Sequence, residues 1–234
     1  MKLLAFETAT EACSVALWLD GEVIERFELA PRRHAELSLP WADELLARAG
    51  VARSQLDAIA VGRGPGAFTG VRLAIALAQG VALALDRPVV PVSTLAALAM
   101  QAGDGNVLAA IDARMSEVYF ATYRLHAGEL TSLSDEALAP PDQVVVPDAE
   151  PWQGVGTGFG ALQGVLAQRL APQLQSVNAE ALPHAADIAR LAARAYARGE
   201  AIAPERIEPA YLRNNVALTL VEQQALRDGR DKSQ

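Results

Sequence analysis

Two stretches of this 234-residue chain follow the same plan, and this internal repeat limits the possible folds more than any other feature. LLAFETATEACSVALWLDGEV (residues 3–23) and LAAIDARMSEVYFATYRLHAGEL (residues 108–130) each contain an apolar run, an acidic residue, a short polar turn, a second apolar run and a hairpin with Gly-Glu. The two stretches match once two residues are inserted near the second hairpin. We expect a mixed α/β protein with two similar lobes, each beginning with three consecutive strands.

A glycine-rich turn, GRGPGAFTGVR (residues 62–72), separates a predicted strand at 58–61 from a predicted helix at 69–85. Such a turn lets the backbone approach another surface closely, and the unpaired amides at the start of the helix could hold phosphate. No lysine follows the glycines, so the P-loop mechanism is missing. The helix is rich in alanine and apolar on nearly every face, so two surfaces must cover it. We therefore favour close packing over phosphate binding.

A second helix is predicted at residues 34–50. Leu37, Trp41 and Leu45 share one face of this helix, and Pro40 marks either a late start or a kink.

The linker GDGN divides the chain into a first lobe at 1–102 and a second, less regular lobe at 103–204. The second lobe includes an amphipathic helix at 183–198. The C-terminal segment, 205–228, is expected to join the first lobe and to contain a final helix at 216–227.

Composition narrows the class of protein. Hydrophobic residues make up 51% of the chain and charged residues 21%, so a full core can be buried. The formal net charge of −8 argues against this chain alone gripping the backbone of a nucleic acid. A single cysteine, Cys13, excludes an internal disulfide, and no uninterrupted apolar run reaches the roughly 18 residues of a membrane span. We expect a soluble cytoplasmic protein without a signal peptide.

Acidic residues end the first strand of each predicted lobe, Glu7 in one and Asp112 in the other. Together with Thr8 and Thr10, they describe a nucleotide cleft in which turns clamp phosphates and a carboxylate holds Mg²⁺. The other interpretation is that the acids simply terminate their strands; an aspartate would also be commoner than a glutamate as the metal ligand. The three histidines are isolated in the sequence, and it contains no nucleophile elbow or paired metal ligands. We therefore predict no catalytic residue and no metal site.

Five segments carry a family resemblance, in order, within residues 1–124: LLAFETATEACSVAL, HAELSLPWADELL, AVGRGPGAFTGVRLAIALAQGVAL, PVVPVSTLAALA and AAIDARMSEVYFA. EPAYLRNNVA near the end adds to it. These segments resemble the TsaB family of bacterial tRNA threonylcarbamoyladenosine biosynthesis subunits, once grouped with glycoprotease-like proteins. The resemblance implies the duplicated fold shared by actin, sugar kinases and Hsp70. It also implies a role in modifying the adenosine next to the anticodon of tRNAs that read ANN codons.

In that family the catalytic relative TsaD transfers a threonylcarbamoyl group from its adenylate, and TsaE supplies ATPase activity. TsaD carries metal-binding histidines between its glycine motif and its second half, whereas the corresponding stretch here, PVVPVSTLAALA, has none. The resemblance therefore implies a non-catalytic scaffold that binds TsaD and helps to recruit TsaE. The complex uses ATP and Mg²⁺, this subunit is expected to bind no cofactor, and tRNA is reached only indirectly.

The family pairs TsaB with TsaD through two helices, which correspond to residues 34–50 and 69–85 here. The expected interface residues are His34, Leu37, Trp41, Leu45, Phe68, Thr69, Gly70, Val71, Ala74 and Ala78, and the free chain is expected to form a homodimer there. Two alternatives stay open. One is a stand-alone ATPase that uses the cleft near Glu7 and Asp112, and the other is a peptidase, for which the sequence offers neither a metal site nor a nucleophile dyad.

Overall fold

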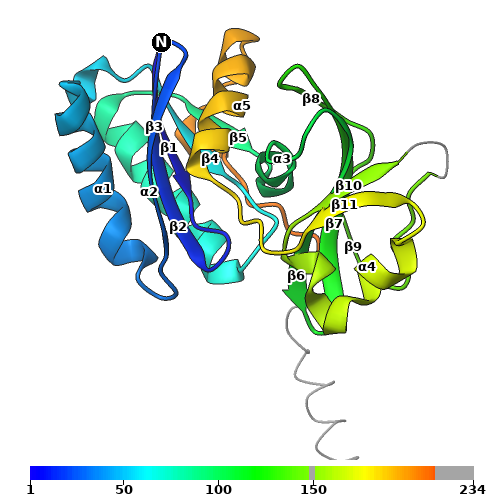
Figure 1. Ribbon diagram of the computed structural model, residues 1–234. Helices are drawn as coiled ribbons and strands as arrows, with labels where there is room; N and C mark the ends of the chain where they lie inside the picture. Colours follow the sequence, from blue (N-terminus) through cyan, green and yellow to red (C-terminus); the bar gives the residue numbers. More distant parts are fainter. Residues whose placement is uncertain (148–150, 214–234) are drawn as a thin grey trace, which may run out of the picture.

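The computed structural model describes residues 1–147 and 151–213, which form two lobes, each built on one β-sheet (Figure 1). The first lobe contains β1 (Lys2–Glu7), β2 (Ala12–Leu19), β3 (Glu22–Leu29), α1 (His34–Ala49), η1 (Arg53–Gln55), β4 (Ala58–Gly62), α2 (Phe68–Leu85) and β5 (Val89–Val92). After α3 (Thr94–Ala99), the second lobe contains β6 (Gly105–Arg114), β7 (Glu117–His126), β8 (Glu129–Ser132), β9 (Ala137–Ala139), β10 (Trp152–Val155), η2 (Thr157–Phe159), η3 (Ala161–Gly164), α4 (Val165–Leu170) and β11 (Leu174–Asn178). The described chain ends with α5 (Ala185–Ala197), η4 (Pro204–Arg206) and an extended segment.

The pairing of the strands confirms the internal repeat. The first sheet has the order β3-β2-β1-β4-β5 and the second β11-β10-β6-β7-β8, with β9 beside β7. In each sheet the first strand is antiparallel to the second and parallel to a later strand, β4 for β1 and β10 for β6. The predicted end of β6 at Asp112 was too early, because the strand continues to Arg114 through an irregular register.

The first sheet is covered on both faces, which explains the nearly continuous apolar runs of β1 and β4. On one face, Phe6, Val15 and Ile59 form a core with α1 and α2. On the other face, small side chains such as Ala5 and Ala60 lie under α5, which also presents alanines to the sheet. Small residues on both surfaces let α5 pack closely on the sheet.

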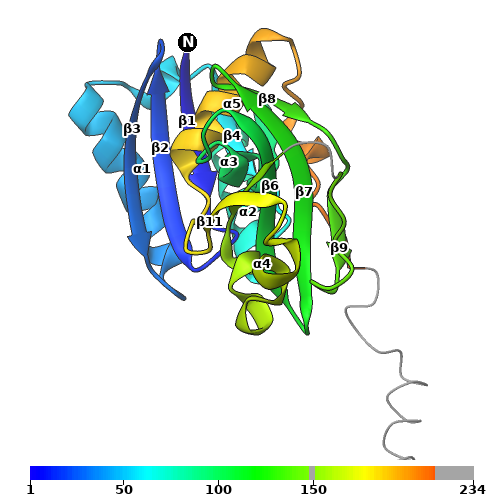
Figure 2. The same ribbon diagram turned by 45° about the vertical axis from the view of Figure 1, so that its right-hand side comes forward.

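Helices α3 and α5 exchange lobes: α3 follows the strands of the first lobe in the chain but packs on the second sheet, and α5 does the reverse. Leu95 and Leu98 of α3 pack with Val107 and Ala109 of the second sheet, whereas α5 packs on the first sheet. Both helices lie between the two sheets (Figure 2). The division into lobes at 1–102 and 103–204 therefore does not follow the packing, because each of these helices buries its apolar face against the sheet across the linker.

The extended segment after η4 returns to the first lobe. Ile207 is buried in the core beneath α1 and α2, and the Ala210 amide donates to the Arg63 carbonyl at 2.9 Å. The described part of the segment thus packs against the first lobe. The helix predicted at 216–227 lies outside the described residues.

Helices α1 and α2 cover the same face of the first sheet. Helix α1 begins at His34 and runs through Pro40, which is exposed, so the interruption of its hydrogen bonding faces solvent. In the described part of the chain, α2 is the one helix long and apolar enough to cross a membrane by length and composition. Its inner face packs on the sheet through Ala74, Ala78 and Ala82, as in a core helix of a globular protein. Of its other apolar side chains, Leu83 is 62% exposed, whereas Leu77, Val81 and Leu85 are partly buried against the core.

Candidate interlobe cleft and docking groove

The glycine-rich turn packs against the β1–β2 turn of the same chain. A Cβ atom on Gly66 would lie 2.5 Å from the Ala9 carbonyl oxygen, and one on Gly70 would lie 2.0 Å from the Thr8 carbonyl oxygen. The Ala67 amide donates to the Ala9 carbonyl at 2.7 Å, and the Thr8 hydroxyl donates to the Gly70 carbonyl at 2.7 Å. The predicted close packing is therefore made within the chain, and only glycine fits at these two positions.

The second lobe repeats this arrangement with the glycine cluster GVGTGFG. Cβ atoms on Gly156 and Gly158 would lie 2.3 Å from the Ala110 carbonyl oxygen and 2.7 Å from the Ala110 Cβ atom. Between them, the Thr157 hydroxyl accepts a hydrogen bond from the Asp112 amide at 3.1 Å. Each lobe therefore packs a glycine turn closely on its first strand or on the turn that follows that strand, and residues of both glycine turns line the cleft between the lobes.

Glu7 does not face this cleft. Its side chain is buried, with Oε1 accepting from the Ala9 amide at 2.7 Å and Oε2 accepting from the Thr94 hydroxyl at 2.9 Å. Its carboxyl group also fills the space beside Gly62, where a Cβ atom would lie 1.9 Å from Oε2. Burial raises the pKa of Glu7 to about 7, although these hydrogen bonds oppose the shift. The expectation that Glu7 could hold a metal in the cleft was wrong, because the side chain links β1 to the start of α3 in the interior.

The cleft between the lobes is a cavity of about 520 Å³. Of the four predicted nucleotide-binding residues, Thr10 and Asp112 line it, together with Arg114 and Thr157, which were not predicted. Thr8 is fully buried and its hydroxyl is committed to Gly70. The Asp112 carboxylate forms an ion pair with Arg114 at 2.9 Å. In the described chain, no three His, Cys, Asp or Glu side chains group in a way that could hold a metal ion. These residues do not fit a Mg²⁺–nucleotide site.

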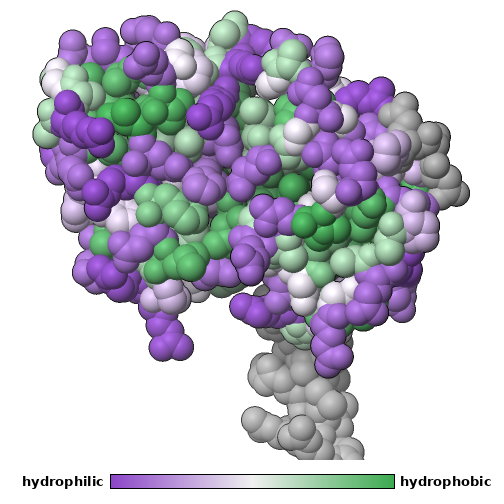
Figure 3. All heavy atoms as spheres, viewed as in Figure 1, coloured by the Kyte–Doolittle hydropathy of each residue, from purple (hydrophilic) through white to green (hydrophobic). Residues whose placement is uncertain are grey.

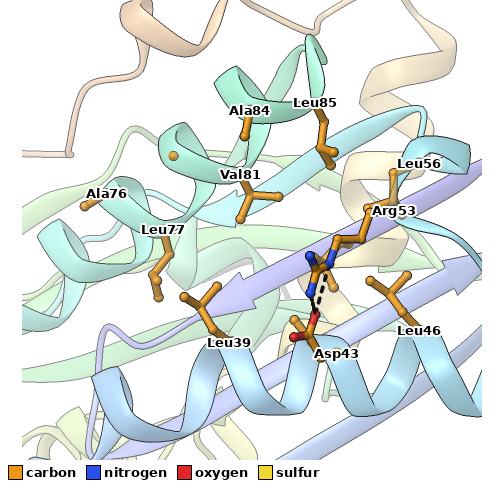
Figure 4. A pocket seen from close by; sticks show the side chains of 13 residues that line it. Leu39, Asp43, Leu46, Arg53, Leu56, Ala76, Leu77, Val81, Ala84 and Leu85 are labelled. Carbon is orange, nitrogen blue, oxygen red and sulfur yellow. Dashed lines mark hydrogen bonds and ion pairs between the residues drawn. The ribbon is translucent and has the colours of Figure 1, made fainter.

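A second hollow, of about 650 Å³, runs between the outer surfaces of α1 and α2; we call it the α1–α2 groove. Figure 4 shows the facing side chains, with Leu39 and Leu46 on α1 and Leu77 and Val81 on α2. The only charged pair on its wall among the described residues is Asp43–Arg53, at 2.7 Å. In Figure 3, hydrophobic surface gathers at the upper left, over the part of the first lobe where α1 and α2 lie in Figure 1. The groove is an apolar surface of the kind that marks a protein–protein contact.

The structure corrects the choice of interface residues on these helices. Five of the ten predicted residues are buried in the core beneath the helices, with exposed fractions between 0% and 6%: Trp41, Leu45, Val71, Ala74 and Ala78. Gly70 faces the β1–β2 turn, and the His34 ring contacts the carbonyls of that turn. Leu37 is half-buried against the core, and only Phe68 and Thr69 are well exposed.

The predicted residues lie mainly on the faces of the helices that meet the sheet, and not on the faces that line the groove. The alanines of α2 occur at alternate positions, so Ala74 and Ala78 face the sheet, whereas Ala76, Gly80 and Ala84 face outward along the groove. A helix that is apolar on every side gives no signal of which side faces the sheet. Leu39 lines the groove and is 46% exposed, but it was not among the predicted residues.

The duplicated sheets and the paired glycine turns define a class of two-lobed proteins. Comparison of the chain with known families and solved structures identifies this class. The chain matches the family described as TsaD, tRNA N6-adenosine threonylcarbamoyltransferase, over residues 27–220. A solved structure described as YeaZ from Pseudomonas aeruginosa superposes with a TM-score of 0.84 at 50% identity, over 90% of this chain and 99% of that one.

Curated relatives refine the assignment within this class. The tRNA threonylcarbamoyladenosine biosynthesis protein TsaB of Escherichia coli K12 is 44% identical, over 93% of this chain and 96% of its own length. The protein of the same name from Haemophilus influenzae is 41% identical, over 92% of this chain and 95% of its own length. The chain belongs to the TsaB family.

Proposed function

We propose that this chain is the non-catalytic partner subunit of the complex that forms N6-threonylcarbamoyladenosine next to the anticodon of tRNAs reading ANN codons. As a TsaB family member, it takes part in tRNA threonylcarbamoyladenosine biosynthesis. The observation that carries the proposal of a partner subunit is the α1–α2 groove, an apolar surface left open between two helices. Such a surface is costly to leave in water and is typical of a subunit contact.

The occupant of the groove in this proposal is the catalytic subunit TsaD. Gly80 supports close approach by a partner helix, because nothing lies within 4 Å of where its Cβ atom would be. A stable contact of this kind would bury on the order of 1,600 Å² in total. When TsaD is absent, two copies of this chain pair through the same groove. TsaE joins the heterodimer, tRNA is held mainly by the partners, and the complex works in the cytoplasm.

A reconstitution tests the proposal. TsaD, TsaE, ATP, Mg²⁺, threonylcarbamoyl-adenylate and unmodified tRNA are combined with and without this chain, and modified adenosine is measured. We expect modification only when the chain is present. Equal modification in its absence would contradict the proposal.

The alternative of a stand-alone ATPase rests on the cleft of about 520 Å³ between the lobes. Its Asp112 carboxylate is already paired with Arg114, and Glu7 is turned into the interior. Titration of the isolated chain with Mg-ATP in a calorimeter, followed by a phosphate-release assay, separates the two functions. The proposal of a scaffold expects neither binding heat nor turnover.

A further inference from the structure

A third hollow lies where both lobes and the C-terminal segment meet, away from the α1–α2 groove. It has a volume of about 240 Å³ and is lined by Phe68 and Val71 of α2, by Met115 and Tyr119 of the second lobe, and by Tyr211. Three of these side chains are exposed to solvent: Phe68 by 49%, Tyr211 by 52% and Met115 by 77%. The hollow therefore combines an apolar interior with large apolar side chains at its rim. We call it the aromatic pocket.

Arg72 lies next to the aromatic pocket and is held by two aromatic side chains that line it, Phe68 and Tyr211. Its guanidinium carbon lies 3.5 Å from the centre of the Phe68 ring and 5.5 Å from the centre of the Tyr211 ring. Its Nε atom donates to the Tyr211 hydroxyl at 2.8 Å. Within the described residues Arg72 forms no ion pair, so its terminal nitrogens present a planar, pre-oriented pair of donors. That geometry matches a carboxylate, which guanidinium binds through two parallel hydrogen bonds.

The charged side chains on the wall of the aromatic pocket are arginines. Arg114 and Arg213 line it, and no carboxylate is among the described residues that do so. Arg213 is held by Glu117 at 2.6 Å and contacts the Met115 sulfur at 3.1 Å, which keeps the wall of the second lobe in place. Arg114 likewise pairs with the Asp112 carboxylate at 2.9 Å, so Arg72 supplies the charge that is available to a ligand. A carboxylate is the group that complements it.

We propose that the aromatic pocket docks an acidic segment of another protein, which places one large apolar side chain in the hollow and a neighbouring carboxylate on Arg72. A concave apolar site with a charged rim is the arrangement by which an anchor residue binds. RNA is disfavoured because Arg72 already covers a face of the Phe68 ring, which a stacked base would need. The site uses the start of α2, whereas the α1–α2 groove begins at Ala76 on that helix. The two surfaces can therefore bind different partners at once.

Fluorescence anisotropy with the full chain tests the proposal. The probes are a labelled synthetic peptide with one leucine flanked by aspartates and glutamates, the same peptide with asparagines and glutamines, and a labelled unmodified tRNA. We expect the acidic peptide to bind and its neutral counterpart to bind at least roughly tenfold more weakly. Arg72→Gln should weaken acidic peptide binding by a similar factor. Arg48→Gln, which removes the same charge from an exposed site on α1, should not change it.

Tyr211→Phe keeps the ring but removes the hydroxyl that orients Arg72, so an intermediate loss is expected. Gly80→Arg, in the α1–α2 groove, should leave peptide affinity unchanged, so a failure of TsaD docking and a failure of this pocket are seen separately. The proposal is overturned if neither peptide binds, if both bind equally, if Arg72→Gln has no more effect than Arg48→Gln, or if only tRNA binds in an Arg72-dependent way.

Discussion

Glu7→Gln replaces a fully buried carboxyl group by an amide of nearly the same shape. In the native protein the carboxyl accepts hydrogen bonds from the Ala9 amide and the Thr94 hydroxyl. Glutamine can accept from Ala9 through its oxygen and donate to the Thr94 hydroxyl oxygen through its nitrogen, so both contacts can be kept. The substitution therefore mainly removes the ability to titrate.

The size of the effect follows from the pKa of Glu7, which burial raises from 4.5 to about 7. The folded state binds this proton more tightly than the unfolded state. The resulting contribution to the free energy of unfolding is therefore fully present below pH 4.5 and is lost as pH rises through 7. Each pKa unit corresponds to about 1.4 kcal/mol. Between pH 5 and pH 8 the wild type should lose about 2.5 kcal/mol of unfolding free energy from this group.

Urea unfolding of the wild type and Glu7→Gln, measured from pH 5 to pH 8 in one buffer system, gives the comparison. The difference in unfolding free energy, variant minus wild type, should rise by about 2.5 kcal/mol across this range because the glutamine does not ionise. The ¹³C resonance of the Glu7 carboxyl should titrate near pH 7. Parallel stability profiles, or a carboxyl that titrates near pH 4.5, would refute the reasoning.

Three further substitutions test other contacts. Gly70→Ala forces a methyl group to within van der Waals overlap of the Thr8 carbonyl, so thermal unfolding should show a loss of roughly 2 kcal/mol or more; an unchanged melting temperature would contradict the close packing. His184→Gln removes the partner of Glu25, whose hydrogen bond raises the pKa of His184. The unfolding free energy of the wild type should therefore fall as pH rises from 6.5 through the raised pKa of His184, and that of the variant should not. If both proteins lost unfolding free energy equally with pH, His184 would not contribute in this way. Ala78→Arg places a charge in the fully buried core and should abolish folding, as seen by circular dichroism, whereas a folded variant would place this residue on the surface instead.

The sequence predicted correctly those elements whose pattern depends only on residues close together in the chain. The repeated strand order, the glycine turn and the first helix could be predicted because alternation, glycine clusters and helical spacing are properties of neighbouring residues. Pro40 left the start of α1 open, and the structure begins this helix at His34. The end of β6 was missed because an irregular register at Asp112 has no clear sequence signal.

Contacts between distant segments could not be predicted in the same way. The orientation of α2 depends on which of its apolar faces meets the sheet, and alanines on both faces gave no preference. The opposite placement of α3 and α5 depends on how the two lobes pack, which no local pattern encodes. Glu7 terminates a strand in either interpretation, and only the position of Thr94 shows that its carboxyl faces the interior. The aromatic pocket joins residues more than a hundred positions apart, Phe68 and Tyr211 among them.

The affinity of Gly80 variants for TsaD tests the proposed docking of TsaD in the α1–α2 groove. Gly80 lies within α2 with nothing within 4 Å of its Cβ position, so replacing it by alanine or arginine should preserve or raise stability by up to about 1 kcal/mol. Circular dichroism should therefore show both variants folded. Measured by calorimetry, Gly80→Arg should weaken TsaD binding by at least roughly a hundredfold, with a matching loss of tRNA modification, and Gly80→Ala should have a smaller effect. A folded Gly80→Arg protein that binds TsaD as tightly as the wild type would show that TsaD does not dock in the groove.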